Sequence, residues 1–209
     1  MRKCPDCETP IPDGVAACPG CGLVVDLLAA SDGILDLARR YRKEGNARAK
    51  VIYDELDLLI PDNWEVQFFV KYYEFKAAPT LDPGYVKALG DSLTDVFMAL
   101  KYDSECTDKG KALQEMLFYC QDVADEEMRN LVPCARNNDI ACEDLYLSLF
   151  HLINKYSELC DIFISECGST VVTIQQKCKE TLRLASLPMK EYYRRNPARL
   201  ERLKSQRKR

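Results

Sequence analysis

The sequence predicts an all-α protein, a helical bundle or repeat-like helical array preceded by a small metal-binding module. Three observations carry this prediction. Four cysteines fall within the first 22 residues, and apolar residues then recur at helical spacing from residue 31 to residue 187. No segment shows the sustained alternation that is typical of an independent strand. We therefore expect a metal module over residues 1–25, a helical domain of about seven helices over 26–188 and a basic tail over 189–209.

The metal module contains two Cys-x-x-Cys pairs, Cys4 with Cys7 and Cys18 with Cys21, separated by ten residues. Four thiolates can close a tetrahedron around one ion, as a structural zinc site requires. One Zn²⁺ is the expected cofactor, with iron or two disulfides as the alternatives; the segment between the pairs has no aromatic residue to shield a redox iron. A closed site of four sulfurs has no position for a substrate, so we expect the metal to be purely structural.

The two cysteine pairs also resemble a known module. The stretches Cys4-Pro5-Asp6-Cys7 and Cys18-Pro19-Gly20-Cys21-Gly22 look like the two knuckles of the short zinc ribbon found at the amino end of many bacterial and archaeal proteins. Glu8 stands where the first knuckle of a symmetrical ribbon has glycine. The resemblance covers residues 1–25 and implies metal binding without an activity, since such ribbons accompany very different bodies. It implies four ligands: Cys4, Cys7, Cys18 and Cys21.

Three amphipathic helices are predicted directly after the metal module. The first begins at the cap Ser31-Asp32 and ends at Gly45-Asn46, and the second ends at Ile60-Pro61. Asp62 and Glu65 resemble a capping box for the third, which closes near residue 78. The apolar stripes of the three helices are Ile34, Leu37, Ala38 and Tyr41; Ala49, Ile52, Tyr53 and Leu56; and Val66, Phe69, Val70 and Tyr73.

Four more helices are predicted before the tail. Asp82 caps the fourth, with Pro83 in its first turn, and the fifth runs from about Asp108 until Pro133 ends it. The sixth has the clearest period and lasts until Gly168, and the seventh ends at Leu187-Pro188. Their stripes include Leu89, Leu93 and Phe97; Leu113, Leu117 and Cys120; Leu145, Leu149, Leu152 and Tyr156; and Val171, Ile174 and Cys178.

Part of the helical domain resembles a tetratricopeptide repeat. Residues 46–64 are similar to the second helix of such a repeat, with Ala49 at the small position, Tyr53 at the aromatic position and Pro61 closing the unit. In the preceding helix Ala38 and Tyr41 match if the intervening turn is one residue shorter than usual. The similarity implies a tetratricopeptide-like helical hairpin at residues 31–64 and a groove for a peptide or partner helix. The alternative is that these are ordinary core residues at helical spacing.

Two aromatic residues of the third helix are candidates for partner contacts. Phe68 and Tyr72 lie off the stripe of that helix, so we expect them to be exposed, together with Trp64 and Tyr73 as possible contact residues. Packing of the helix on two sides is the alternative explanation.

Charge is unevenly distributed along the chain. The formal net charge is −4, but residues 190–209 carry +7, so the first 189 residues carry −11. The tail is expected to be a loosely held helix that binds either an external polyanion or the acidic body. Its candidate nucleic-acid-binding residues are Arg194, Arg195, Arg199, Arg202, Lys204, Arg207, Lys208 and Arg209.

Cysteine usage and hydropathy indicate the compartment. The other seven cysteines are odd in number and contain no Cys-x-x-Cys pair, so we expect buried apolar thiols in a reducing cytoplasm. No apolar run approaches the ~18 residues of a membrane span, and Met1-Arg2-Lys3 leads directly into the first cysteine pair without the apolar segment of a secretory signal. The sequence therefore predicts a cytoplasmic protein.

No residue set in the sequence proposes an enzyme. The single histidine, His151, lies within the strongest apolar helix and is expected to be a satisfied or partly exposed helix residue. Phosphate loops and hydrolase signatures are missing from the sequence.

Two functional hypotheses of different class follow from these features. The first is a non-enzymatic zinc-binding adaptor whose helical body binds other proteins, with no small-molecule substrate. The alternative is a nucleic-acid-binding protein that uses the basic tail together with the ribbon. The adaptor is favoured because the acidic body would repel a polyanion and residues 1–25 are not basic.

Overall fold

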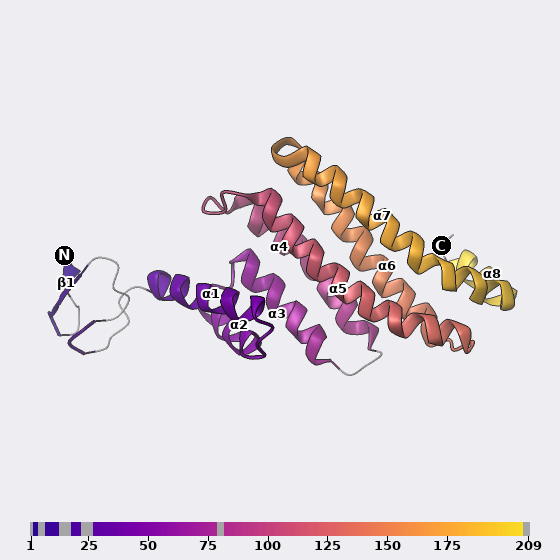
Figure 1. Ribbon diagram of the computed structural model, residues 1–209, viewed down its shortest axis with the longest axis horizontal. Coiled ribbons are helices and arrows are strands. Elements are labelled where there is room, and N and C mark those ends of the chain that lie inside the picture. Colours follow the sequence, from indigo (N-terminus) through magenta and orange to yellow (C-terminus); the bar gives the residue numbers. More distant parts are fainter. Residues whose placement is uncertain (1, 4–6, 13–17, 22–26, 79–81, 207–209) are drawn as a thin grey trace. The chain divides into compact units, whose positions relative to one another are not determined.

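The fold is all-α, as the helical periodicity predicts. A computed structural model describes residues 2–3, 7–12, 18–21, 27–78 and 82–206 (Figure 1). Within these residues the only strands are two residues long and pair antiparallel, with Arg2 opposite Ile11. The elements are β1 Arg2–Lys3, β2 Pro10–Ile11, α1 Leu27–Lys43, α2 Arg48–Leu59, α3 Trp64–Ala77, α4 Pro83–Tyr102, α5 Lys109–Arg136, α6 Ala141–Leu159, the short 3₁₀ helix η1 Cys160–Phe163, α7 Ile164–Arg195 and α8 Pro197–Gln206.

The chain divides into two compact units, Met1–Tyr73 and Glu74–Arg209. The first contains the cysteine-rich segment, α1, α2 and most of α3, and the second contains the last turn of α3 and everything after it. The predicted boundary at residue 188 falls inside α7. The seven helices predicted from periodicity correspond in order to α1–α7, and α8 forms in the basic tail.

Short polar residues set the helix ends of the first unit. Gly45, with a φ of 65°, follows α1, and the Asn46 side chain accepts a hydrogen bond from the Arg48 amide at 3.0 Å. The start of α3 differs from the predicted capping box. Asn63, not Asp62, caps this helix, because its side chain accepts from the amides of Glu65 and Val66 at 3.0 and 3.2 Å. Glu65 therefore has no capping role, and its side chain lies in the interior of the unit.

A buried ionic cluster joins the three helices of the first unit. Glu65 of α3 is 3% exposed and lies 2.8 Å from the guanidinium of Arg42 on α1, which is 6% exposed. The Tyr53 hydroxyl of α2 donates to the same carboxylate oxygen at 2.9 Å. The second oxygen accepts from Arg39 at 2.7 Å, and the Arg42 guanidinium stands 3.9 Å from the centre of the Phe69 ring. One carboxylate thus connects all three helices.

Phe68 and Tyr72 of α3 are buried, contrary to the prediction that they are exposed, whereas Tyr73 is partly exposed. Phe68 is 0% exposed and Tyr72 7% exposed, and Trp64 is also buried. Phe68 and Phe69 form an edge-to-face pair with ring centres 5.1 Å apart. A helix that is apolar on more than one face is packed on more than one side, which was the alternative explanation. Trp64, Phe68 and Tyr72 are therefore core residues and not contact candidates.

Removing the Glu65 charge should strongly destabilise the protein. In Glu65→Gln, Arg42 keeps its buried charge without a counter-ion, and the loss of one partner of a buried pair costs roughly 3–5 kcal/mol. Chemical denaturation followed by circular dichroism measures this change in the free energy of unfolding. Asp36→Asn is the control, because Asp36 pairs with Arg39 in an exposed position and should change stability by less than about 1 kcal/mol. Equal effects of the two substitutions would contradict the role of the cluster.

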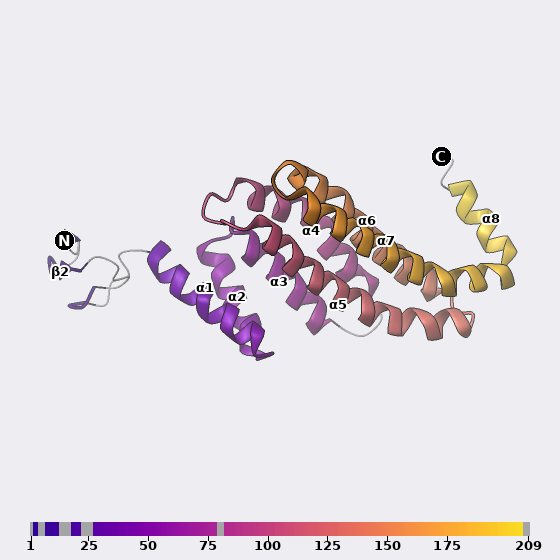
Figure 2. The same ribbon diagram turned by 45° about the horizontal axis from the view of Figure 1, so that its top comes forward.

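Helices α4 to α7 form the body of the second unit (Figure 2). Helix α4 packs on α6, α5 packs on both α6 and α7, and α6 packs on α7. Asp82 caps α4 as predicted, accepting from the Gly84 amide at 2.9 Å, and Asp108 caps α5 by accepting from the Lys111 amide. The core between these helices includes an edge-to-face pair of Phe97 and Tyr156, whose ring centres are 5.1 Å apart.

Two prolines do not end their helices as predicted. Pro133 lies inside α5 and Pro188 inside α7. Apolar residues beyond each proline join one buried cluster. Their burial stabilises the helix by more than it loses with the single backbone hydrogen bond that a proline removes. The cluster consists of Leu131, Ala135, Cys142, Leu145, Met189 and Tyr192. The sixth helix ends at Leu159 and not near Gly168 as predicted, because η1 follows it. A break does occur close to Gly168, since Cys167 leaves helical geometry with φ −144° and ψ 48°.

Glu127 of α5 is buried with an unsatisfied oxygen. The residue is 3% exposed, and its Oε2 atom has no hydrogen-bond partner in the part of the chain that the structure describes. Burial, with a smaller contribution from the charge of Glu126, raises the pKa of Glu127 to about 7. The folded protein therefore holds this proton more tightly than the unfolded chain does.

Glu127 should make stability fall as the pH rises. Its protonated form contributes fully near pH 4.5, and the contribution is lost as the pH passes through about 7. Glu127→Gln, which carries no proton to lose, should match the wild type at pH 5 and exceed it by about 2 kcal/mol at pH 8. Urea unfolding at the two pH values measures the difference. Asp125→Asn, at an exposed position near Glu127, is the control. If the pH dependence of stability is unchanged in Glu127→Gln, the raised pKa of Glu127 is wrong.

Candidate metal centre

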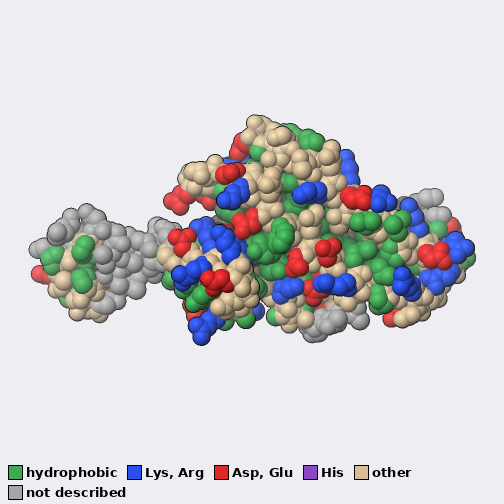
Figure 3. Space-filling view, viewed as in Figure 1, with side chains coloured by type: hydrophobic (Ala, Val, Ile, Leu, Met, Phe, Trp, Pro, Cys, Tyr) green, Lys and Arg blue, Asp and Glu red, His purple; other side chains and the backbone are tan. Residues whose placement is uncertain are grey.

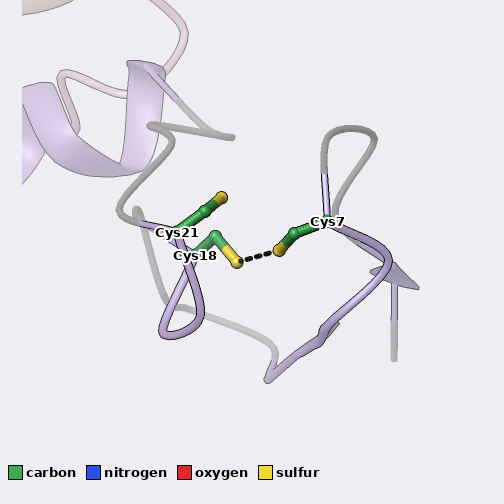
Figure 4. A group of neighbouring side chains, drawn as sticks. All are labelled: Cys7, Cys18 and Cys21. Carbon is green, nitrogen blue, oxygen red and sulfur yellow. Dashed lines mark hydrogen bonds between the residues drawn. The ribbon is translucent and has the colours of Figure 1, made fainter.

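Three of the four predicted metal ligands lie together in the first unit. Cys7 follows β1, whereas Cys18 and Cys21 lie in the second cysteine pair, beyond β2. Figure 4 shows the three side chains directed toward one another. Cys4, the fourth predicted ligand, lies outside the described residues.

The sulfur geometry suits a single metal ion. The Sγ atoms of Cys7, Cys18 and Cys21 all lie within 4.8 Å of one another, and those of Cys7 and Cys18 are 3.4 Å apart. Zinc–sulfur bonds of about 2.3 Å in a tetrahedron place sulfurs about 3.8 Å apart, which falls between these two distances. The three cysteines are free thiols, so the disulfide alternative does not describe them. This triad can hold a metal ion.

Hydrogen bonds prepare the sulfurs for the ionised state that a metal requires. The Gly20 amide donates to Cys18 Sγ at 3.3 Å, an N–H···S bond that offsets thiolate charge. Cys7 Sγ lies 3.2 Å from the Thr9 hydroxyl, which donates once the thiol has lost its proton. Hydrogen bonds from the Thr9 hydroxyl and amide are the main reason that the pKa of Cys7 falls to about 6.

Backbone conformation brings Cys7 close to the second cysteine pair. A Cβ atom added to Gly20 would lie 2.5 Å from Thr9 Oγ1, so only glycine permits this approach. Glu8 has a φ of 57°, the left-handed conformation for which a ribbon uses glycine. Residue 8 therefore adopts a backbone conformation that glycine favours, although it is a glutamate.

The seven remaining cysteines behave largely as the sequence predicts. All are free thiols; four are buried and three are partly exposed. Burial raises the pKa of Cys120 well above its usual range and that of Cys178 to about 11. The buried members are Cys120, Cys142, Cys160 and Cys178, and the partly exposed members are Cys106, Cys134 and Cys167.

Some of the predicted nucleic-acid-binding residues contact the rest of the chain, and others are exposed to solvent. The Arg195 guanidinium donates to the carbonyls of Ala135 and Arg136 at 2.7 and 3.0 Å, and thereby satisfies the carboxyl end of α5. Arg194 bonds Glu191 at 2.8 Å. Arg199 lies 3.6 Å from Glu143 of α6. The first half of the tail therefore folds against the body.

The remaining basic residues follow in α8. Arg202 is exposed there, and α8 turns away from the end of α7 (Figure 2). Lys and Arg side chains gather with acidic ones over the end of α7 and over α8 (Figure 3). The Lys204 side chain and residues Arg207, Lys208 and Arg209 lie outside the described part of the chain.

His151 is a partly exposed, hydrogen-bonded helix residue, as predicted. Its Nε2 lies 2.7 Å from Asp91 Oδ1, and the other oxygen of Asp91 lies 2.5 Å from Lys87 Nζ. The sequence contains no signal for this group, because Asp91 and His151 are 60 residues apart. The contact depends on Gly90, where a Cβ would come within 2.8 Å of the His151 ring.

No known protein family, curated protein or solved structure matches this chain. The resemblances to a zinc ribbon and to a tetratricopeptide hairpin therefore stay predictions. Among the described residues no helix is long and apolar enough to cross a membrane.

Metal binding should protect the cysteine triad from alkylation. With its pKa at about 6, Cys7 is roughly nine-tenths ionised at pH 7 in metal-free protein, so iodoacetamide should modify it first. One equivalent of Zn²⁺ should slow this reaction at least tenfold, as mass spectrometry of the modified peptides would show. The buried Cys120, Cys160 and Cys178 should stay unmodified until urea is added. Equal rates at Cys7 with and without zinc would contradict the site.

Proposed function

We propose that this chain is a non-enzymatic zinc-binding adaptor, in which one structural Zn²⁺ folds the amino-terminal module and the helical body binds a partner protein. The observation that carries the proposal is the convergence of the Cys7, Cys18 and Cys21 thiols at distances that suit one ion. Cys4 supplies the fourth sulfur by its sequence position.

The chemistry of the donors supports zinc. Soft thiolates select Zn²⁺ or iron among the common metals, and four of them form a closed tetrahedral site. The described part of the module offers little apolar surface for a core, since Ile11 is its only large aliphatic side chain. Binding of about 10–16 kcal/mol by structural zinc would supply the folding free energy of such a module.

A structural role of the metal follows from the same donors. Four sulfur ligands fill the coordination sphere of zinc, so neither water nor a substrate has a position on the ion. The ion would then act by fixing the two cysteine pairs against each other. The module would present its surface to a partner and would not catalyse a reaction.

The environment of the tail favours a protein partner over a nucleic acid. Arg195 and Arg199 are engaged by the chain's own carbonyls and by Glu143, so their positive charge is already partly balanced. Arg194 is paired with Glu191 within its own helix. A phosphate backbone would have to compete for these groups next to an acidic body.

The adaptor proposal predicts a specific pattern of metal and partner binding. Zinc analysis of the purified chain should give one ion per molecule, and Cys7→Ser with Cys18→Ser should remove it. Affinity capture from the source cells, followed by size-exclusion chromatography of the same sample, should yield one protein in fixed stoichiometry with the zinc-loaded chain. The double serine variant should capture less of that protein.

A nucleic-acid-binding assay tests the alternative function. Deletion of the tail is unsuitable, because Met189 and Tyr192 belong to the buried cluster. The matched variant instead carries glutamine at Arg202, Lys204, Arg207, Lys208 and Arg209. Micromolar binding of a 20-nucleotide single-stranded RNA that weakens steeply with salt, and is lost in this variant, would overturn the adaptor proposal.

A further inference from the structure

The second unit contains a surface hollow between α4 and α6, which we call the α4–α6 hollow. Gly90 lets the two helices approach closely, since a Cβ there would lie 3.2 Å from the Leu152 backbone. Toward their amino ends the helices leave a cavity of about 360 Å³. Its lining residues are Pro83, Gly84, Lys87, Asp144, Leu147, Ser148 and His151.

Some of the charged groups around the hollow are paired within the chain and one is not. Asp91 forms an ion pair with Lys87 and contacts His151, so the charge of the one lysine in the lining is already balanced. Asp144 is exposed and has no hydrogen bond or ion pair within the part of the chain that the structure describes. Asp144 is therefore a carboxylate without a counter-ion at the hollow, and a cationic group complements it.

The rest of the lining offers an apolar contact and the His151 imidazole. Leu147 is 40% exposed and lies beside Pro83 in the lining. Asp91 Oδ1 lies 2.7 Å from His151 Nε2, and the Lys87 hydrogen bond is the main reason that the pKa of Asp91 is lowered.

The spacing of these groups matches a short peptide. Asp144 and His151 are seven residues apart on one face of α6, which corresponds to about 10 Å along the helix axis. An extended chain advances about 3.3 Å per residue, so three residues cover this length. A single small cation would reach only one end of the hollow.

We propose that the α4–α6 hollow binds an extended segment of about three residues from a partner protein, with a basic side chain at Asp144 and an apolar side chain against Leu147 and Pro83. The inference rests on the proposed adaptor function and specifies where the partner docks and which residues it presents.

Titration with blocked tripeptides tests the inference. The probe is N-acetyl-Arg-Leu-Ala-amide, added at millimolar concentration to the ¹⁵N-labelled full chain and followed by amide chemical shifts. Saturable shifts should appear at the lining residues of α4 and α6. Asp144→Asn and Leu147→Ser should each weaken binding at least threefold, whereas Asp125→Asn on the exposed face of α5 should leave it unchanged.

The matched probe N-acetyl-Glu-Leu-Ala-amide should bind at least tenfold more weakly. Equal binding of the two peptides, shifts outside the hollow, no saturable shifts, or an unchanged affinity in Asp144→Asn would each overturn the inference. Thermal denaturation of both hollow variants establishes that they are folded. If a partner of the zinc-loaded chain is still captured in full by Asp144→Asn and Leu147→Ser, this docking site is wrong although the adaptor function stands.

Discussion

The burial of one carboxylate determines how the first unit is assembled. An isolated charge inside a protein is strongly unfavourable, so Glu65 persists in the interior only because Arg42, Arg39 and Tyr53 surround it. These partners come from α1 and α2, whereas the carboxylate comes from α3. Any other arrangement of the three helices would leave a charge unpaired. The ionic cluster therefore specifies the packing, and the aromatic residues of α3 fill the space around it.

The cysteine module is held together by different interactions. It has too few apolar side chains for a core, and its order depends on short-range features: the strand pair of β1 and β2, the close approach of Gly20 to Thr9, and hydrogen bonds to sulfur. These features gather three thiols at distances that suit a metal. The Glu65 carboxylate finds its counter-ions within the protein, whereas the three thiols could take theirs from outside, as a metal ion.

The second unit shows how tertiary contacts override local signals. Proline 133 and Pro188 are strong helix-ending residues, yet α5 and α7 continue past them into one apolar cluster. The same extension brings Arg195 to the end of α5, where its guanidinium satisfies backbone carbonyls. Basic residues that look like a free tail in the sequence thus become part of the packing, and α8 continues the chain beyond them.

Local patterns in the sequence determined the all-α class, the order of seven helices, the Asp82 cap and the three thiols that could hold a metal ion. Helical periodicity and Cys-x-x-Cys spacing act over a few residues, so they can be read without knowledge of the fold. Only the tertiary structure decided that Glu65 lies inside, that Phe68 and Tyr72 are core residues, and that Asp91 meets His151 across 60 residues. The reason is that burial and long-range pairing depend on which helix faces meet, and that is a property of the whole chain.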